Sequence, residues 1–139
     1  MKKIAIVGTG AVGGYYGGLL ARSGLDIHFL LRSDYEVARD KGLTIRTEGE
    51  EFTLPVQAYT SPENIGPCDL VIITLKSTAN YVLPELLNPL VRSHTHLLTL
   101  QNGLGNIELL QNLYPANHIS GGLCFVCINR VAPAVFENY

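Results

Sequence analysis

The sequence has no excess of basic charge and no basic stripe. Lysine and arginine number 10 against 12 aspartate and glutamate residues, which gives a formal net charge of −2. This balance argues against a nucleic-acid partner, because such proteins neutralise backbone phosphates with clustered cations. Charged residues make up 16% of the chain and hydrophobic residues 47%. That composition predicts one folded domain over residues 1–139, with its own core, rather than a disordered segment.

Long apolar runs are also absent. No run approaches the ~20 residues that a membrane-spanning helix requires, so we expect no membrane partner. The start, MKKIAIVGTGAVGG, places lysines before an apolar run as a signal peptide does. Its many glycines and the lack of an A-x-A cleavage pattern argue against that interpretation. The chain has only three cysteines, which cannot all pair, and this predicts a reducing, cytoplasmic environment.

Residues that could bind a metal are sparse. Cys124 and Cys127 are spaced as CxxC, but no second CxxC or histidine cluster completes a zinc site. We therefore interpret them as two buried small residues. His94 and His96 would share one face of a strand, but at its start, away from the carboxyl ends of the strands. We predict no metal site.

What the sequence does contain is an alternation of short apolar runs with helical patterns. We expect strands over residues 3–7, 26–31, 69–74 and 96–100, and helices over 11–23, 34–41, 79–92 and 105–113. The third helix contains Pro84 and Pro89 and should be broken. The pattern predicts an α/β fold with a Rossmann-type, doubly wound, mostly parallel sheet, whose first, third and fourth strands are central.

Two segments depart from this alternation. Residues 43–60 alternate in polarity around Glu48-Gly49-Glu50, which predicts an inserted antiparallel β-hairpin. After position 118 the chain reads as a strand, a turn near 130–133 and the start of another strand. The sequence stops at Tyr139 inside that strand, so we expect a domain truncated at its C-terminal end.

A glycine-rich segment, VGTGAVGG, joins the first strand to the first helix. In a GxGxxG motif of this context Gly8 permits the tight turn, Gly10 lets a pyrophosphate approach the backbone, and Gly13 permits close helix packing. The helix start offers free N–H groups to phosphates. We therefore predict cofactor binding at Gly8, Thr9, Gly10, Ala11, Val12 and Gly13; close packing alone is the alternative.

Three further glycines lie inside the same predicted helix. Each of Gly14, Gly17 and Gly18 costs ~1 kcal/mol relative to alanine in a helix interior. We expect them to permit a close approach by either sheet backbone or cofactor.

The end of the second predicted strand indicates which dinucleotide is bound. NAD-binding folds place an acidic residue about twenty positions after the glycines, where it binds the ribose hydroxyls. Here that position is Arg32, whose guanidinium can bind a 2′-phosphate, with Ser33 as an additional donor. A surface arginine on a loop is the alternative. Asp34, or Ser33, would cap the next helix. We predict NADP(H) rather than NAD.

Polar residues follow two other buried strands. Lys76 lies in TLKST and Asn102 in LQNGLG, each where a strand ends. Ligands of open α/β sheets bind beyond the carboxyl ends of the strands, so both residues are candidates for binding cofactor and substrate. A solvated lysine and ordinary Asn-Gly turn chemistry are the alternatives.

Together, IAIVGTGAVGG, FLLRSD, DLVIITLKS and LQNGLGNIELL resemble the N-terminal domain of 2-dehydropantoate 2-reductases (ketopantoate reductases) over essentially the whole chain. The resemblance implies NADPH-dependent reduction of 2-dehydropantoate, a small 2-keto acid, to pantoate, a step toward pantothenate and coenzyme A. It also implies that residues 8–13 hold the pyrophosphate and Arg32 the 2′-phosphate. Lys76 would contact the cofactor near the nicotinamide, and Asn102 both cofactor and substrate.

The family's C-terminal helical domain, which carries the general-acid lysine and most substrate contacts, has no counterpart here. We therefore predict no catalytic residue in this chain, and cofactor binding without turnover. Two other functions stay open: another NAD(P)-dependent 2- or 3-hydroxyacid dehydrogenase, and a non-catalytic NADPH-binding module. The sequence leaves the oligomeric state open, with a homodimer as one option.

Overall fold

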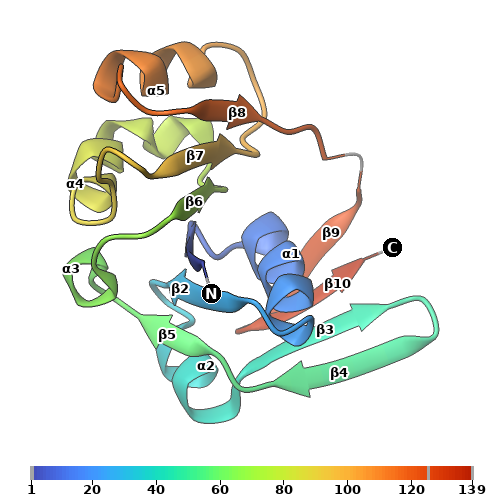
Figure 1. The fold of residues 1–139 in the computed structure, drawn as a ribbon. Coiled ribbons are helices and arrows are strands. Elements are labelled where there is room, and N and C mark those ends of the chain that lie inside the picture. Colours follow the sequence, from blue (N-terminus) through green and yellow to red (C-terminus); the bar gives the residue numbers. More distant parts are fainter. Residues whose placement is uncertain (1, 125, 139) are drawn as a thin grey trace.

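A six-stranded parallel sheet forms the centre of the structure, a computed structural model that describes residues 2–124 and 126–138 (Figure 1). Its strands lie in the order β5-β2-β1-β6-β7-β8. Their bounds are β1 (Lys3–Val7), β2 (Asp26–Leu30), β5 (Gln57–Tyr59), β6 (Leu70–Ile73), β7 (His96–Thr99) and β8 (Ile119–Gly121). All five pairings are parallel. The predicted Rossmann-type sheet is confirmed, and β1, β6 and β7 are interior strands because apolar residues occupy both their faces.

Helical segments connect these strands. They are α1 (Ala11–Arg22), α2 (Tyr35–Lys41), α3 (Pro62–Ile65), the 3₁₀ helix η1 (Ser77–Val82), α4 (Leu83–Leu87) and α5 (Asn106–Leu113). The break predicted in the third helix is confirmed: η1 gives way to α4 where Pro84 occupies the first turn, a position that needs no backbone N–H donor. The short helix α3 was not predicted.

A second sheet of four strands lies beside the first, in the order β4-β3-β10-β9. Its strands are β3 (Leu43–Thr47), β4 (Glu50–Leu54), β9 (Ile128–Ala132) and β10 (Val135–Asn138). The antiparallel hairpin is confirmed for β3 and β4, which turn at Glu48-Gly49. Its predicted extent to residue 60 is wrong, because residues 57–59 form β5 and pair with β2 in the main sheet. The turn between β9 and β10 lies at 133–134, at the end of the predicted range.

Helix α1 lies between the two sheets, and its glycines make this possible (Figure 1). Added Cβ atoms at Gly17 and Gly18 would come within 2.5 Å of the Phe29 ring and 2.9 Å of Ile45 respectively. An added Cβ at Gly14 would lie 2.6 Å from Cδ2 of Phe136. The close approach is therefore made by side chains of β2, β3 and β10. The expectation of sheet backbone or cofactor at these glycines is wrong.

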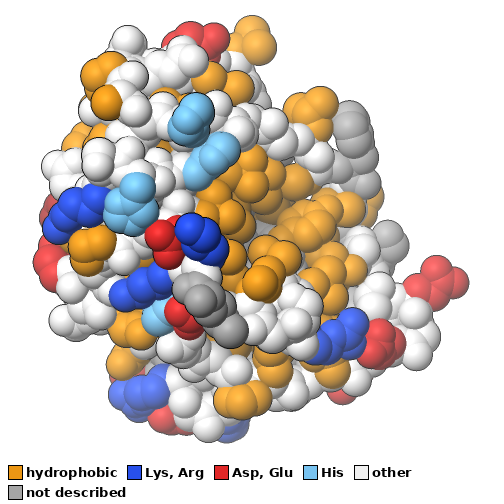
Figure 2. All heavy atoms as spheres, in the orientation of Figure 1, with side chains coloured by type: hydrophobic (Ala, Val, Ile, Leu, Met, Phe, Trp, Pro, Cys, Tyr) orange, Lys and Arg blue, Asp and Glu red, His pale blue; other side chains and the backbone are white. Residues whose placement is uncertain are grey.

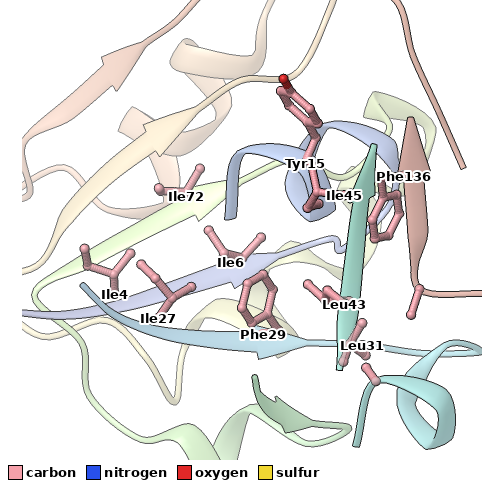
Figure 3. Packing of buried hydrophobic residues seen from close by; sticks show 12 residues of the cluster. Ile4, Ile6, Tyr15, Ile27, Phe29, Leu31, Leu43, Ile45, Ile72 and Phe136 are labelled. Carbon is pink, nitrogen blue, oxygen red and sulfur yellow. The ribbon is translucent and has the colours of Figure 1, made fainter. Parts of the chain in front are cut away.

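One hydrophobic core spans both sheets (Figure 3). Side chains of β1 and β2 meet those of β3 and β10 around α1, and Phe29, Ile45 and Phe136 are fully buried. A second core lies on the opposite face of the main sheet, under α3, α4 and α5. Burial at ~25 cal/mol per Å² makes these two clusters the main source of stability. They hold rigid the strand ends from which the functional loops emerge.

The face of β6 and β7 that continues from α1 carries an apolar groove of about 290 Å³. Ile72, Leu98 and Leu123 contribute to its lining, and hydrophobic side chains gather in the middle of the face seen in Figure 2. Among the described helices none is long and apolar enough to cross a membrane.

Candidate functional site

A cleft of about 610 Å³ opens at the carboxyl ends of β1, β2, β6 and β7. The loops that follow these four strands supply most of its lining. Its residues are Gly8, Thr9, Gly10, Ala11, Val12, Leu30, Leu31, Arg32, Ser33, Asp34, Thr60, Thr74, Leu75, Lys76, Ser77, Thr78, Leu86, Leu100, Gln101, Asn102 and Arg130. Every residue predicted from the sequence to bind cofactor or substrate lies here except Gly13. The parallel sheet brings them together because all its strands end at the same edge.

The glycine loop contributes bare backbone to this cleft. Gly8 has a φ of +97°, and an added Cβ would lie 2.6 Å from the backbone nitrogen of Leu75, so only glycine fits the turn. Gly10 has no atom within 4 Å of an added Cβ, so the space beside it is open. Gly13 faces inward, where its Cβ would lie 2.5 Å from the Gly8 carbonyl oxygen. It permits α1 to pack closely and lies behind the lining.

The N-terminus of α1 carries an uncompensated partial positive charge. Gly10 occupies the N-cap position without a side-chain cap, and the first turn contains no acidic residue. The free N–H groups of this first turn therefore have no anionic partner within the helix. The hydroxyl of Thr9 donates to the carbonyl oxygen of Leu30 at 2.9 Å, which fixes the loop against the end of β2. Such a loop can bind a phosphate group.

A polar network joins the loop after β6 to the loop after β7. Its centre is the buried Asn106, whose side-chain oxygen accepts from Asn80 Nδ2 at 2.9 Å and whose Nδ2 donates to the Asn102 carbonyl oxygen at 3.2 Å. The Ser77 hydroxyl also donates to that carbonyl oxygen, at 2.7 Å. These bonds tie together the loops that carry Lys76 and Asn102, which both line the cleft.

The other end of the cleft carries Arg32 and Ser33, both exposed, and an ion pair between the buried Asp34 and the exposed Arg130. Arg130 donates to both carboxylate oxygens of Asp34, at 2.9 and 2.6 Å, and the Ala134 N–H donates at 3.0 Å. These hydrogen bonds hold the pKa of the Asp34 carboxyl below its ordinary value despite burial. Asp34 occupies the N-cap position of α2, as predicted, but its side chain makes no cap hydrogen bond and binds Arg130 and Ala134 instead.

The sequence analysis named neither Arg130, which lines the cleft, nor the buried Asn106, which hydrogen-bonds residues 80 and 102. Arg130 lies 96 residues from Asp34 in the chain, on β9 of the second sheet, and no local pattern marks it. Asn106 begins α5, a position where polar residues are common, so nothing in the sequence marks it as buried.

The cysteines and histidines lie apart from the cleft. Cys127 is exposed and Cys124 partly exposed, so their predicted burial is wrong; Cys68 is buried instead. His94 precedes β7 and lies 3.3 Å from Asp69, whereas His96 on β7 bonds Ser120 at 2.8 Å. Within residues 2–124 and 126–138, no three histidine, cysteine or acidic residues are grouped to hold a metal ion.

The comparisons with known proteins agree on one family. The family model "Ketopantoate reductase PanE/ApbA" matches residues 4–138. The 2-dehydropantoate 2-reductase of Nostoc sp. is 49% identical over 138 residues, which are 99% of this chain and 43% of that protein.

Solved structures give the same result. The crystal structure of 2-dehydropantoate 2-reductase from Geobacter metallireducens is 52% identical, with a TM-score of 0.94, over 98% of this chain and 46% of that one. A PanE/ApbA family ketopantoate reductase from Ralstonia eutropha is 29% identical, with a TM-score of 0.91, over 99% of this chain and 46% of that one. The chain thus spans less than half the length of these relatives.

Proposed function

Since the chain belongs to the PanE/ApbA ketopantoate reductase family, we propose that it is the NADPH-binding part of a 2-dehydropantoate 2-reductase. The observation that carries this proposal is the cleft, in which the glycine loop, Arg32, Lys76 and Asn102 line a single space. These residues come from four different strand ends, and a dinucleotide is long enough to require all of them. A reducing compartment suits three free thiols, so we place the reaction in the cytoplasm.

The residues present fit an extended anionic dinucleotide. The diphosphate would lie against Gly10, where backbone N–H groups and the start of α1 can donate and no side chain intrudes. Arg32 would bind the 2′-phosphate, with Ser33 as a second donor. Three cationic side chains and one carboxylate line the cleft, and that excess of positive charge suits a ligand carrying several phosphates.

Lys76 and Asn102 would serve the nicotinamide and substrate end. The nicotinamide, when bound, would supply hydride for the ketone carbon of the keto acid, and the ketone oxygen would need a proton to become an alcohol. The Asn102 amide can donate to that oxygen and fix its direction, and the Lys76 ammonium can stabilise the negative charge that develops on it. We assign no general acid to this chain, and we expect it to bind NADPH without reducing 2-dehydropantoate.

A substitution at Gly10 tests the binding proposal. The valine of Gly10→Val would occupy open space in the cleft rather than clash with the protein, because an added Cβ meets nothing within 4 Å. We expect at least ~10-fold weaker binding of both NADPH and NADH, measured by the fluorescence change of each nucleotide on binding. Thr53→Val on the exposed face of β4 is the matched control and should change neither affinity. Unchanged binding to Gly10→Val, with the fold intact by circular dichroism, would contradict the proposal.

The reaction itself is tested by consumption of NADPH in the presence of 2-dehydropantoate and a panel of other 2-keto acids. We expect none from this chain alone. Consumption of NADPH by the 139 residues alone would show that they contain a general acid. Faster consumption with another 2-keto acid than with 2-dehydropantoate would show that the proposed substrate is wrong.

A further inference from the structure

The ion pair between Asp34 and Arg130 lies in the same cleft as Arg32, where the 2′-phosphate would bind. An acidic side chain at that place would oppose phosphate binding. Asp34 follows Arg32 by two residues, lines the same cleft, and has a side chain only 5% exposed. A carboxylate there would repel a 2′-phosphate through a medium that screens charge less well than bulk water. Such an acid near the end of β2 is instead typical of folds that bind the unphosphorylated ribose.

The geometry of the pair compensates the negative charge of Asp34 with the positive charge of Arg130. Arg130 binds both oxygens of Asp34 in the bidentate arrangement, and the Ala134 N–H supplies a third donor. Bidentate arginine–carboxylate pairs are among the strongest side-chain interactions. Asp34 is therefore fully engaged by protein donors and turned toward β9.

Arg130 retains donors of its own. It uses Nε and Nη2 toward Asp34, and Nη1 takes no part in these two bonds. Its side chain is 42% exposed and lines the cleft. An arginine guanidinium has five N–H donors in a planar fork, so one that grips a carboxylate along one edge can still bind an anion through the remaining nitrogen.

Resting on the NADPH site proposed above, we propose that Arg130 is a second residue that selects the phosphorylated cofactor. It neutralises Asp34 and presents Nη1 to the 2′-phosphate opposite Arg32. A purely structural pair, which only ties the β9–β10 hairpin to the loop after β2, would behave differently. Its loss would weaken NADPH and NADH binding by the same factor.

The test compares Arg130→Met, Asp34→Asn and the double variant in the 139-residue chain. Arg130→Met leaves a buried carboxylate without its partner and can unfold the protein. The double variant removes both charges with little change in volume. It leaves no unpaired buried charge, so it can be tested even if Arg130→Met unfolds. Each variant is titrated with NADPH and with NADH by nucleotide fluorescence, and its fold is checked by circular dichroism.

We expect the double variant to bind NADPH ~10-fold more weakly, as the loss of one charged hydrogen bond implies, and NADH within ~2-fold of the wild type. Asp34→Asn alone keeps Arg130 and should bind NADPH at least as well as the wild type. Equal losses for both nucleotides in the double variant would overturn the proposal. So would an unchanged NADPH affinity.

These outcomes separate this inference from the proposed function. If the wild-type chain binds neither nucleotide, the cofactor site itself is wrong and the inference falls with it. If the wild type prefers NADPH and Arg32→Gln abolishes that preference, but the double variant keeps it, Arg32 selects the phosphate and Arg130 does not.

Discussion

Replacing Arg32 is the sharpest test of which dinucleotide the cleft accepts. Arg32 is exposed in the loop between β2 and α2 and lines the cleft. A hydrogen bond to a charged group contributes ~1.5–3 kcal/mol, and solvent exposure favours the lower half of that range. At 1.4 kcal/mol per tenfold change in affinity, Arg32→Gln should weaken NADPH binding by ~10-fold or somewhat more.

Arg32→Asp extends the same series. It adds repulsion between a carboxylate and the 2′-phosphate, on the order of 1 kcal/mol for unit charges 4 Å apart in a water-like medium, so the loss for NADPH should approach ~100-fold. NADH lacks the phosphate, and a carboxylate can accept from its ribose hydroxyls, so its affinity should be unchanged or improved.

The assay is calorimetric titration of the chain with each nucleotide at low and at moderate salt. Arg39→Gln is the matched control, because Arg39 is exposed on α2, pairs with Asp40 and lies outside the cleft lining. It removes the same charge without touching the cleft and should alter both affinities equally and slightly. If Arg32→Asp weakened NADPH and NADH by the same factor, the guanidinium would have no role at the 2′-phosphate.

Two further predictions concern the fold. Burial raises the pKa of the Cys68 thiol to about 11, so at pH 8 only ~0.1% of it is the reactive thiolate. A thiol reagent should therefore label the exposed Cys127 in the native protein and Cys68 only after denaturation, as read by intact mass, and equal labelling rates would contradict the burial. Gly14→Ala should lower the free energy of unfolding by ~1–2 kcal/mol, because the clash with the Phe136 ring exceeds the gain in helix propensity. Urea denaturation measures the free energy of unfolding, and the loss should be smaller in a Phe136→Leu background. A Gly14→Ala chain more stable than the wild type would contradict the close packing of Gly14 against Phe136.

The main sheet could be predicted from the sequence because its signals are local. Apolar runs such as KIAIV predict strands that are buried on both faces. The glycine motif at Gly8–Gly13 predicts a strand before it and a helix after it. Position alone was enough to predict that Lys76 and Asn102 line the cleft. Each follows a buried strand, and the carboxyl ends of these strands must lie at the same edge of the sheet. Pro84 marked the change from η1 to α4 for an equally local reason.

The second sheet could not be predicted in the same way. Residues 57–59 alternate in polarity, and that pattern fits the end of a hairpin as well as an edge strand of the main sheet. The choice depends on pairing with β2, which lies about thirty residues earlier in the chain. Similarly, the glycines of α1 indicate that another part of the protein packs closely against this helix. They do not indicate which part, because Phe136 lies more than a hundred residues away in the chain.

The same limit explains why the partner of the Asp34 side chain was not predicted. An aspartate just before a helix is usually an N-cap residue. The neighbouring sequence around Asp34 also indicates only the start of a helix. Its actual partner, Arg130, reaches it only because β9 and β10 pair, and β10 joins β3 in the second sheet. If the ion pair selects the cofactor as proposed, part of the specificity of the cleft is set by a sheet that contributes no other residue to its lining. Cofactor preference in such a chain cannot be inferred from the residues after β2 alone, because the charge of an acid there depends on what the rest of the fold brings to it.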